Sequence, residues 1–146
     1  MKKLLAIIVA VVMIAACSVT AFADTTTVTY EVQPTYTVAI PASVTLSDAD
    51  VTADITASDV MLENGSQITV TLSAASNTAS GSTFNAKNGD STVTYTITGN
   101  SAISVGDTVA TFTADGSKTL TFSAADKSAT TKSGEHTETL TFTISA

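Results

Sequence analysis

The side chains that could do acid–base chemistry gather near residue 136. His136 is the single histidine of the chain and lies between Glu135 and Glu138. A serine-type hydrolase needs a histidine to take the proton of a serine hydroxyl and a carboxylate to orient the imidazole ring. No serine lies in the Gly-x-Ser-x-Gly turn that exposes such a nucleophile. Glu135 and Glu138 cannot act as a pair of carboxylates on one strand, because residues three apart on a strand face opposite sides. We therefore interpret His136 as a solvated strand residue and expect no enzyme activity and no cofactor.

Three aspartates form the second group of side chains that could bind a ligand. Asp48, Asp50 and Asp54 lie close together in "SDADVTAD", and calcium prefers several carboxylate oxygens. The segment lacks the glycine and the distal glutamate of an EF-hand loop. We expect a solvated acidic loop, with a weak extracellular calcium site as the alternative.

The first 23 residues have the parts of a secretory signal peptide. Lys2 and Lys3 precede an uncharged apolar run over residues 4–16, which is followed by small and polar residues. This run is short for a transmembrane helix, which needs ~20 apolar residues. The sequence therefore predicts export, with residues 1–23 as the signal peptide.

Two processing signals compete within this segment. Ala21 and Ala23, before Asp24, are the small residues that an ordinary signal peptidase accepts. Ile14-Ala15-Ala16 before Cys17 resembles the lipobox of bacterial lipoproteins, in which the cysteine is lipidated and becomes the new N-terminus. We favour the cut before Asp24, and lipidation at Cys17 is the alternative.

The expected mature chain, residues 24–146, has the length of one domain. It keeps 13 acidic residues and four of the six lysines, and so has a net charge of 4 minus 13, or −9. Such a chain should be repelled by nucleic acid and by anionic membranes. Without Cys17 it has no cysteine for a disulfide, so its stability must come from a buried core.

The pattern of apolar residues predicts an all-β chain. Threonine, valine and isoleucine are abundant and suit a pleated surface, and apolar residues alternate with polar ones at the two-residue period of a strand. Strands are expected over residues 27–32, 36–40, 43–46, 67–72, 92–98, 109–114, 118–124 and 138–145, and weaker ones over 51–56 and 83–86.

Turn residues separate these runs. The pairs Asn64-Gly65, Asn88-Gly89, Gly99-Asn100, Asp115-Gly116 and Ser133-Gly134 suit tight turns. The pattern as a whole predicts a single antiparallel immunoglobulin-like β-sandwich of about eight strands.

"YTVAIPASVTL" and "GEHTETLTFTISA" resemble the first and last strands of small secreted surface proteins of Gram-positive bacteria, related to fimbrial or pilin-type and WxL-associated sandwich domains. Gly134, Thr137, Thr139 and Thr141 match a C-terminal strand of that group, with His136 where an aromatic residue is usual. The chain has no tryptophan, so the Trp-x-Leu motif of wall attachment is absent. No sorting signal follows Ile144. The resemblance implies a sandwich fold and a location at the cell surface. The missing motif and the missing sorting signal lead us to expect no covalent wall anchor.

Pilin-type sandwiches can also carry an isopeptide bond between a buried lysine and an asparagine. Lys118, with Asn85 or Asn100, is the candidate pair that this resemblance implies. A buried lysine is costly without a matched partner, and Lys118 follows the turn residues Gly116 and Ser117. We therefore expect Lys118 to be solvated.

These observations predict a non-enzymatic, secreted or cell-surface structural or adhesion module. Its partners would be other copies or other surface subunits, and residues 24–32 could add as a strand to the open edge of another copy. Rows of threonine on the strands could also bind glycans or carry them, although threonine is simply a good strand residue. The alternative is an extracellular binding protein for a glycan or host protein, held to a membrane by a lipid on Cys17.

Overall fold

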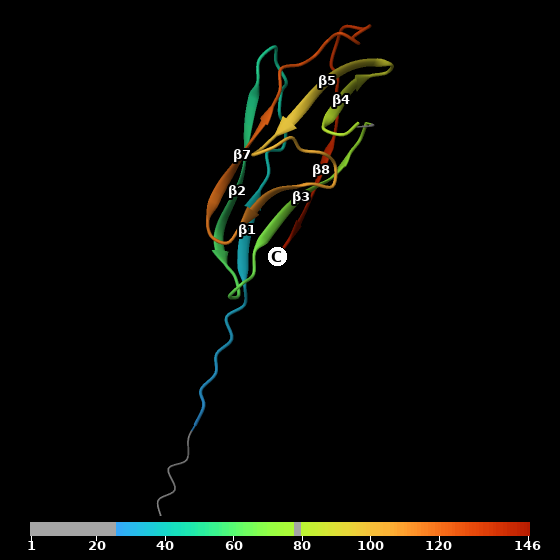
Figure 1. The fold of residues 1–146 in the computed structure, drawn as a ribbon. Coiled ribbons are helices and arrows are strands. Elements are labelled where there is room, and N and C mark those ends of the chain that lie inside the picture. Colours follow the sequence, from blue (N-terminus) through green and yellow to red (C-terminus); the bar gives the residue numbers. More distant parts are fainter. Residues whose placement is uncertain (1–25, 78–79) are drawn as a thin grey trace, which may run out of the picture. The chain divides into compact units, whose positions relative to one another are not determined.

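The computed structural model describes residues 26–77 and 80–146, and within these ranges it is all β, with eight strands and no helix (Figure 1). The strands are β1 (Thr35–Ala39), β2 (Val51–Met61), β3 (Ile68–Ala75), β4 (Thr83–Asn88), β5 (Ser91–Thr98), β6 (Thr108–Phe112), β7 (Gly116–Phe122) and β8 (Leu140–Ser145).

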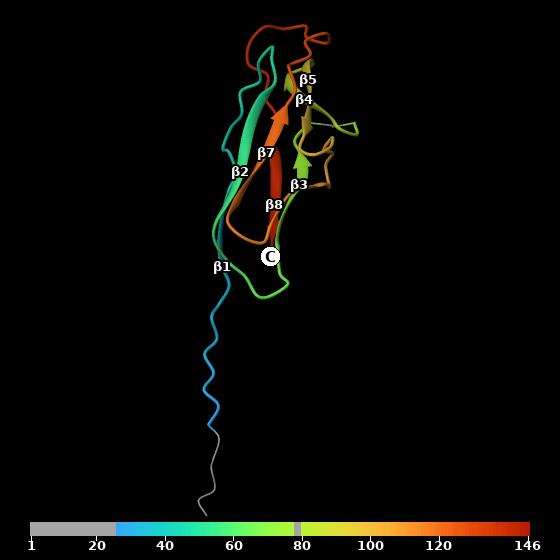
Figure 2. The same cartoon turned by 60° about the vertical axis from the view of Figure 1, so that its left-hand side comes forward.

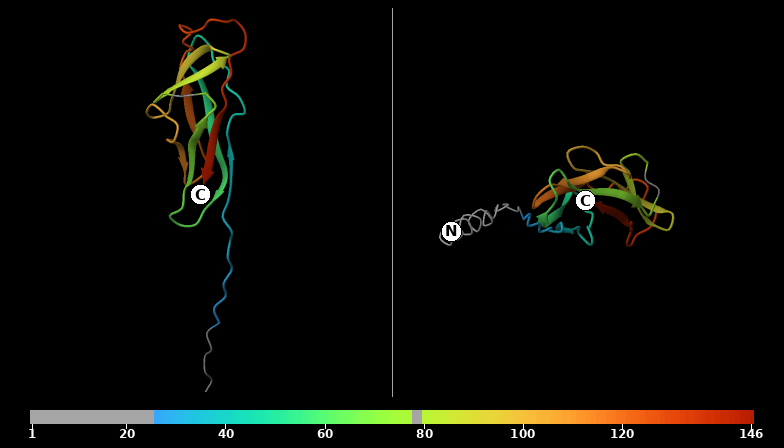
Figure 3. Two further views of the ribbon diagram at one scale, coloured as in Figure 1. Left: turned by 90° about the vertical axis from the view of Figure 1, so that its right-hand side faces the viewer. Right: turned by 90° about the horizontal axis from the view of Figure 1, so that it is seen from below.

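The strands form two antiparallel sheets. The larger sheet has the order β1-β2-β7-β5-β4, and the smaller one has the order β6-β3-β8 (Figure 2). The last strand, β8, pairs with β3 over Thr69↔Ser145 to Ala75↔Leu140, and the two strands run side by side in Figure 3. The antiparallel β-sandwich of about eight strands that the sequence predicted is confirmed.

The core lies between the two sheets and follows the alternation of the strands. On β3 the side chains of Ile68, Val70 and Leu72 are fully buried, while the threonines between them are partly exposed. On β5 every second residue from Ser91 to Ile97 is buried. Burial of these apolar side chains is the main favourable contribution to folding. The chain has a single cysteine, so no disulfide within the chain can add to it.

Two expected strands are absent. Residues 27–32 form no strand, and Val28 and Tyr30 are 89% and 88% exposed. Residues 43–46 are also irregular, although Val44 and Leu46 are partly buried. The alternation is present in both segments, but a strand forms only where a neighbouring strand satisfies its backbone hydrogen bonds. Neither segment belongs to one of the eight described strands.

The two strands that were expected to be weak are well formed. Residues 51–56 begin β2, which runs to Met61 and pairs with both β1 and β7. Residues 83–86 begin β4, which forms a hairpin with β5. Gly89 has a φ of 62° in the tight turn between them, as the Asn-Gly pair predicted. Gly99 and Gly116 do not have a positive φ, and Gly116 is already the first residue of β7.

Candidate functional site

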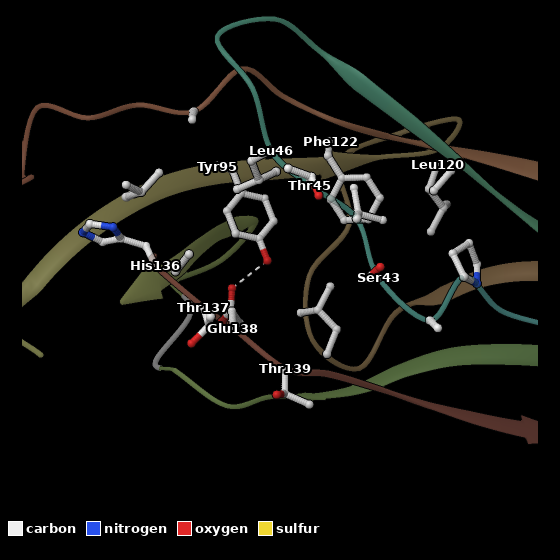
Figure 4. A pocket seen from close by; sticks show the side chains of 18 of the residues that line it. Ser43, Thr45, Leu46, Tyr95, Leu120, Phe122, His136, Thr137, Glu138 and Thr139 are labelled. Atoms are coloured by element: carbon white, nitrogen blue, oxygen red, sulfur yellow. Dashed lines mark hydrogen bonds between the residues drawn. The ribbon is translucent and has the colours of Figure 1, made fainter. Parts of the chain in front are cut away.

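A cavity of about 570 Å³ opens between the two sheets beside β8 (Figure 4). Its walls are residues 40–46 on one side and residues 135–140 with Phe142 on the other. Its floor is made by inward-facing side chains of β2, β4, β5 and β7, among them Tyr95 and Phe122. The floor of the cavity is therefore mostly apolar, while its walls also carry polar side chains, and the cavity lies over the inner face of the larger sheet.

The cavity exists because the two sheets differ in width. The smaller sheet has three strands against five in the larger one, and β8 is its edge strand. Residues 40–46 lie across from β8, but no strand pairing joins them to it. Pro41 in this segment lacks a backbone N–H and cannot donate to a ladder. The inner face of the larger sheet is thus left without a covering strand at this place.

A buried polar pair lies at one end of the cavity. The Tyr95 hydroxyl donates a 2.6 Å hydrogen bond to Oε2 of Glu138, and Figure 4 shows the two side chains pointing toward each other. The other oxygen, Oε1, is buried and has no hydrogen-bond partner among the described residues. Tyr95 and Glu138 are 43 residues apart, so no local spacing in the sequence indicates this contact.

Burial shifts the pKa of both groups in the same direction. Burial, helped by the hydrogen bond to Glu138, raises the pKa of Tyr95 far above its ordinary value. Burial also raises the pKa of Glu138, against the opposing effects of the Tyr95 hydroxyl, the nearby backbone amides of Asn77 and Asn85, and the charge of Lys87. The folded protein thus holds a proton on Glu138 more tightly than an exposed glutamate would.

This shift predicts a pH-dependent effect of Glu138→Gln. The unfolded carboxyl titrates near pH ~4.3, so the stability that protonated Glu138 provides is complete below that pH and is lost as pH rises through the higher folded pKa. Glutamine stays neutral and still accepts from Tyr95. In urea unfolding between about pH 4 and 7, the stability of Glu138→Gln should rise relative to the wild type. A difference that does not change with pH would contradict the raised pKa.

Ser91 and His136 come together as a serine–histidine pair that the sequence did not predict. The Ser91 Oγ lies 2.8 Å from Nε2 of His136, whose Nδ1 lies 3.0 Å from the carbonyl oxygen of Gly134. Ser91 is completely buried, and its Oγ accepts hydrogen bonds from the amides of Thr131 and Lys132 at 2.9 and 3.0 Å. A substrate could not reach this serine, because its side chain is completely buried. Its oxygen already accepts two hydrogen bonds from the segment that precedes β8.

The three aspartates of the calcium hypothesis do not converge. Asp48 pairs with Lys127, and Oδ1 of Asp50 accepts from the amide of Ala124 at 2.9 Å. Oδ1 of Asp54 accepts from the Thr119 hydroxyl at 2.5 Å. Each carboxylate thus contacts a different partner on or after β7. Within residues 26–77 and 80–146, no group of three histidine, cysteine or acidic side chains could hold a metal ion.

Lys118 contacts one of the two asparagines of the isopeptide hypothesis. Its Nζ donates a 2.6 Å hydrogen bond to Oδ1 of Asn100 at an exposed position. Both residues line a second pocket, which also includes Ser101 and Ile103 but no carboxylate. The contact between Lys118 and Asn100 in this structure is therefore a hydrogen bond.

The expected processing residues lie outside the described ranges. These are Cys17, Ala21, Ala23 and Asp24, so both processing hypotheses stay predictions. No helix in the described residues is long and apolar enough to cross a membrane.

The chain was compared with protein families, with curated proteins and with solved structures. No family model, no curated protein and no solved structure matches it.

Proposed function

We propose that this protein is an exported, non-enzymatic structural module of the cell surface, and that copies of it assemble by strand addition. In this assembly, residues 26–34 of one copy pair with a free sheet edge of another. The Thr-rich outward faces of the strands would then remain in contact with water along the assembly.

The single observation that carries this proposal is the exposure of residues 26–32. Their apolar side chains alternate with polar ones as they do in the buried strands, yet Val28 and Tyr30 are almost fully exposed and Val32 is 55% exposed. Exposed apolar side chains in series usually mark an interaction site. A segment with this period is suited to a sheet edge, where its backbone groups find partners and one face is buried.

Free edges are present for such a segment. The edge strands of the two sheets are β1 and β4, and β6 and β8. The edge of β4 is partly covered, because Lys87 exchanges two backbone hydrogen bonds of 3.0 Å with Thr137. Unpaired edges invite pairing with another chain unless they are protected. The sandwich can therefore accept a strand as well as donate one.

Removing the apolar face of the donor segment should abolish assembly. We expect the mature chain to form oligomers in light scattering coupled to size exclusion. The triple variant Val28→Ser, Tyr30→Ser, Val32→Ser, and a chain lacking residues 24–32, should both be monomers that still unfold cooperatively, with a melting temperature that no longer depends on protein concentration. The matched control changes the opposite face, with Thr27→Ser and Thr29→Ser, and should assemble as the wild type does. Oligomers that persist in the truncated chain would refute strand donation by this segment.

A further inference from the structure

We propose that the cavity beside β8 is the acceptor site, and that residues 26–34 of a second copy enter it as an added strand along β8. This inference rests on the proposed function and identifies where the donated strand binds. It predicts a head-to-tail contact in which each copy donates its N-terminal segment and accepts another.

The position of the cavity favours β8 over the other edges. Of the four edge strands, β8 contributes Leu140 and Phe142 to the lining and β4 contributes Ala86, while β1 and β6 contribute no residue. The edge of β4 is already partly covered by the backbone hydrogen bonds between Lys87 and Thr137. A strand added to β8 would extend the smaller sheet across the opening, and it would cover the inner face of the larger sheet over Leu120 and Phe122. At the other edges an added strand would gain backbone hydrogen bonds but would cover no comparable apolar floor.

The residue pattern of the segment fits this position. Alternate residues of a strand lie about 6.6 Å apart on the same face, so Val28, Tyr30 and Val32 would all point toward the floor of the cavity. The threonines between them would point outward, as Thr141 and Thr143 do on β8, where both are exposed. The added strand would thus have the same apolar and Thr-rich faces as the strands that surround it.

The hydroxyl of Tyr30 could form a hydrogen bond at the polar end of the cavity. A tyrosine that becomes buried usually needs a hydrogen-bond partner for its hydroxyl. Glu138, at the polar end of the cavity, has one oxygen without a partner among the described residues. An added strand that placed Tyr30 beside Tyr95 would bring a donor to the carboxylate and would join the aromatic contacts of Tyr95 with Phe84 and Phe122.

Photo-crosslinking can locate the donated strand. The mature full-length chain is prepared with p-benzoylphenylalanine in place of Tyr30, mixed with an isotope-labelled copy, irradiated and digested for mass spectrometry. We expect crosslinks between copies, from position 30 to residues 40–46 or 135–142. Crosslinks to β1 or β6, or within one chain, would overturn this acceptor site but leave strand donation intact if assembly still requires residues 26–32. A chain that is monomeric throughout would overturn both proposals.

A blocked cavity gives an independent test. Val44 lines the cavity and is partly buried, so Val44→Lys should weaken association at least about tenfold, a change that corresponds to ~1.4 kcal/mol. The matched control is Val105→Lys, at an exposed position that does not line the cavity, and it should assemble normally. If Val44→Lys does not melt cooperatively, Ala42→Lys serves in its place, because Ala42 lines the cavity and is exposed. A folded cavity variant that assembles like the wild type would overturn the proposal.

Discussion

Ser91→Ala is expected to lower the free energy of unfolding by about 2–4 kcal/mol, because two backbone amides lose their acceptor and an unsatisfied buried donor costs at most roughly 1–3 kcal/mol. The Ser91 Oγ accepts from the amides of Thr131 and Lys132, and alanine cannot replace it. These residues lie at the surface, so water can reach part of the exposed backbone and keeps the loss below the upper sum. Urea unfolding measures the change.

The loss of stability in Ser91→Ala should also be measurable in the segment between β7 and β8. Ser91 holds the segment between β7 and β8, so the variant should open there more often and be cleaved faster after Lys132 by a lysine-specific protease. The control is His136→Ala. In this variant the Ser91 hydroxyl keeps both amides and can turn toward the carbonyl of Lys132, which lies 3.5 Å away, so we expect a smaller cost, below about 1.5 kcal/mol. Equal losses in the two variants would mean that the imidazole, and not the two amides, is the important partner.

The sequence was sufficient for the fold because most strands bury one face. Alternating apolar residues on a strand indicate directly which side chains face the core. This holds for β5 and for Ile68, Val70 and Leu72 on β3. The same alternation predicted a strand over residues 27–32, and this prediction was wrong. A period of two shows that a segment can pair, but not that a partner is present in the same chain. That failure is informative, because the exposure of apolar side chains in a segment with a strand pattern is the observation that supports the proposed function.

The candidate site could not be read from the sequence in the same way. Its walls come from residues 40–46 and from residues 135–140 with Phe142, and its floor comes from four strands of the larger sheet. The Ser91–His136 contact joins residues 45 positions apart, and the Tyr95–Glu138 contact joins residues 43 apart. No local spacing encodes such contacts, because they depend on how β5 and the segment before β8 are placed by the sandwich. Only the types of the residues, a lone histidine and a glutamate near it, were visible in advance.

Phe84→Ala is expected to cost about 3–5 kcal/mol of stability, the usual range for removing a fully buried phenylalanine. Phe84 is completely buried on β4, and its ring stacks on that of Tyr95 with a centroid distance of 5.6 Å. The apolar pattern of β4 is short, which is why the sequence indicated only a weak strand, but its one aromatic residue is completely buried in the core. The cavity left by alanine would lie directly behind the tyrosine that binds Glu138.

The measurement is again urea unfolding, with Met61→Ala as the control. Met61 is also a large apolar residue on a strand, but it is half exposed, and its replacement should change stability by no more than about 0.5 kcal/mol. Phe84→Leu, which keeps most of the volume, should cost less than alanine. A loss below about 1 kcal/mol in Phe84→Ala would contradict close packing around Tyr95. The floor of the proposed acceptor cavity would then be able to collapse, and a donated strand would not find the rigid surface that our proposal requires.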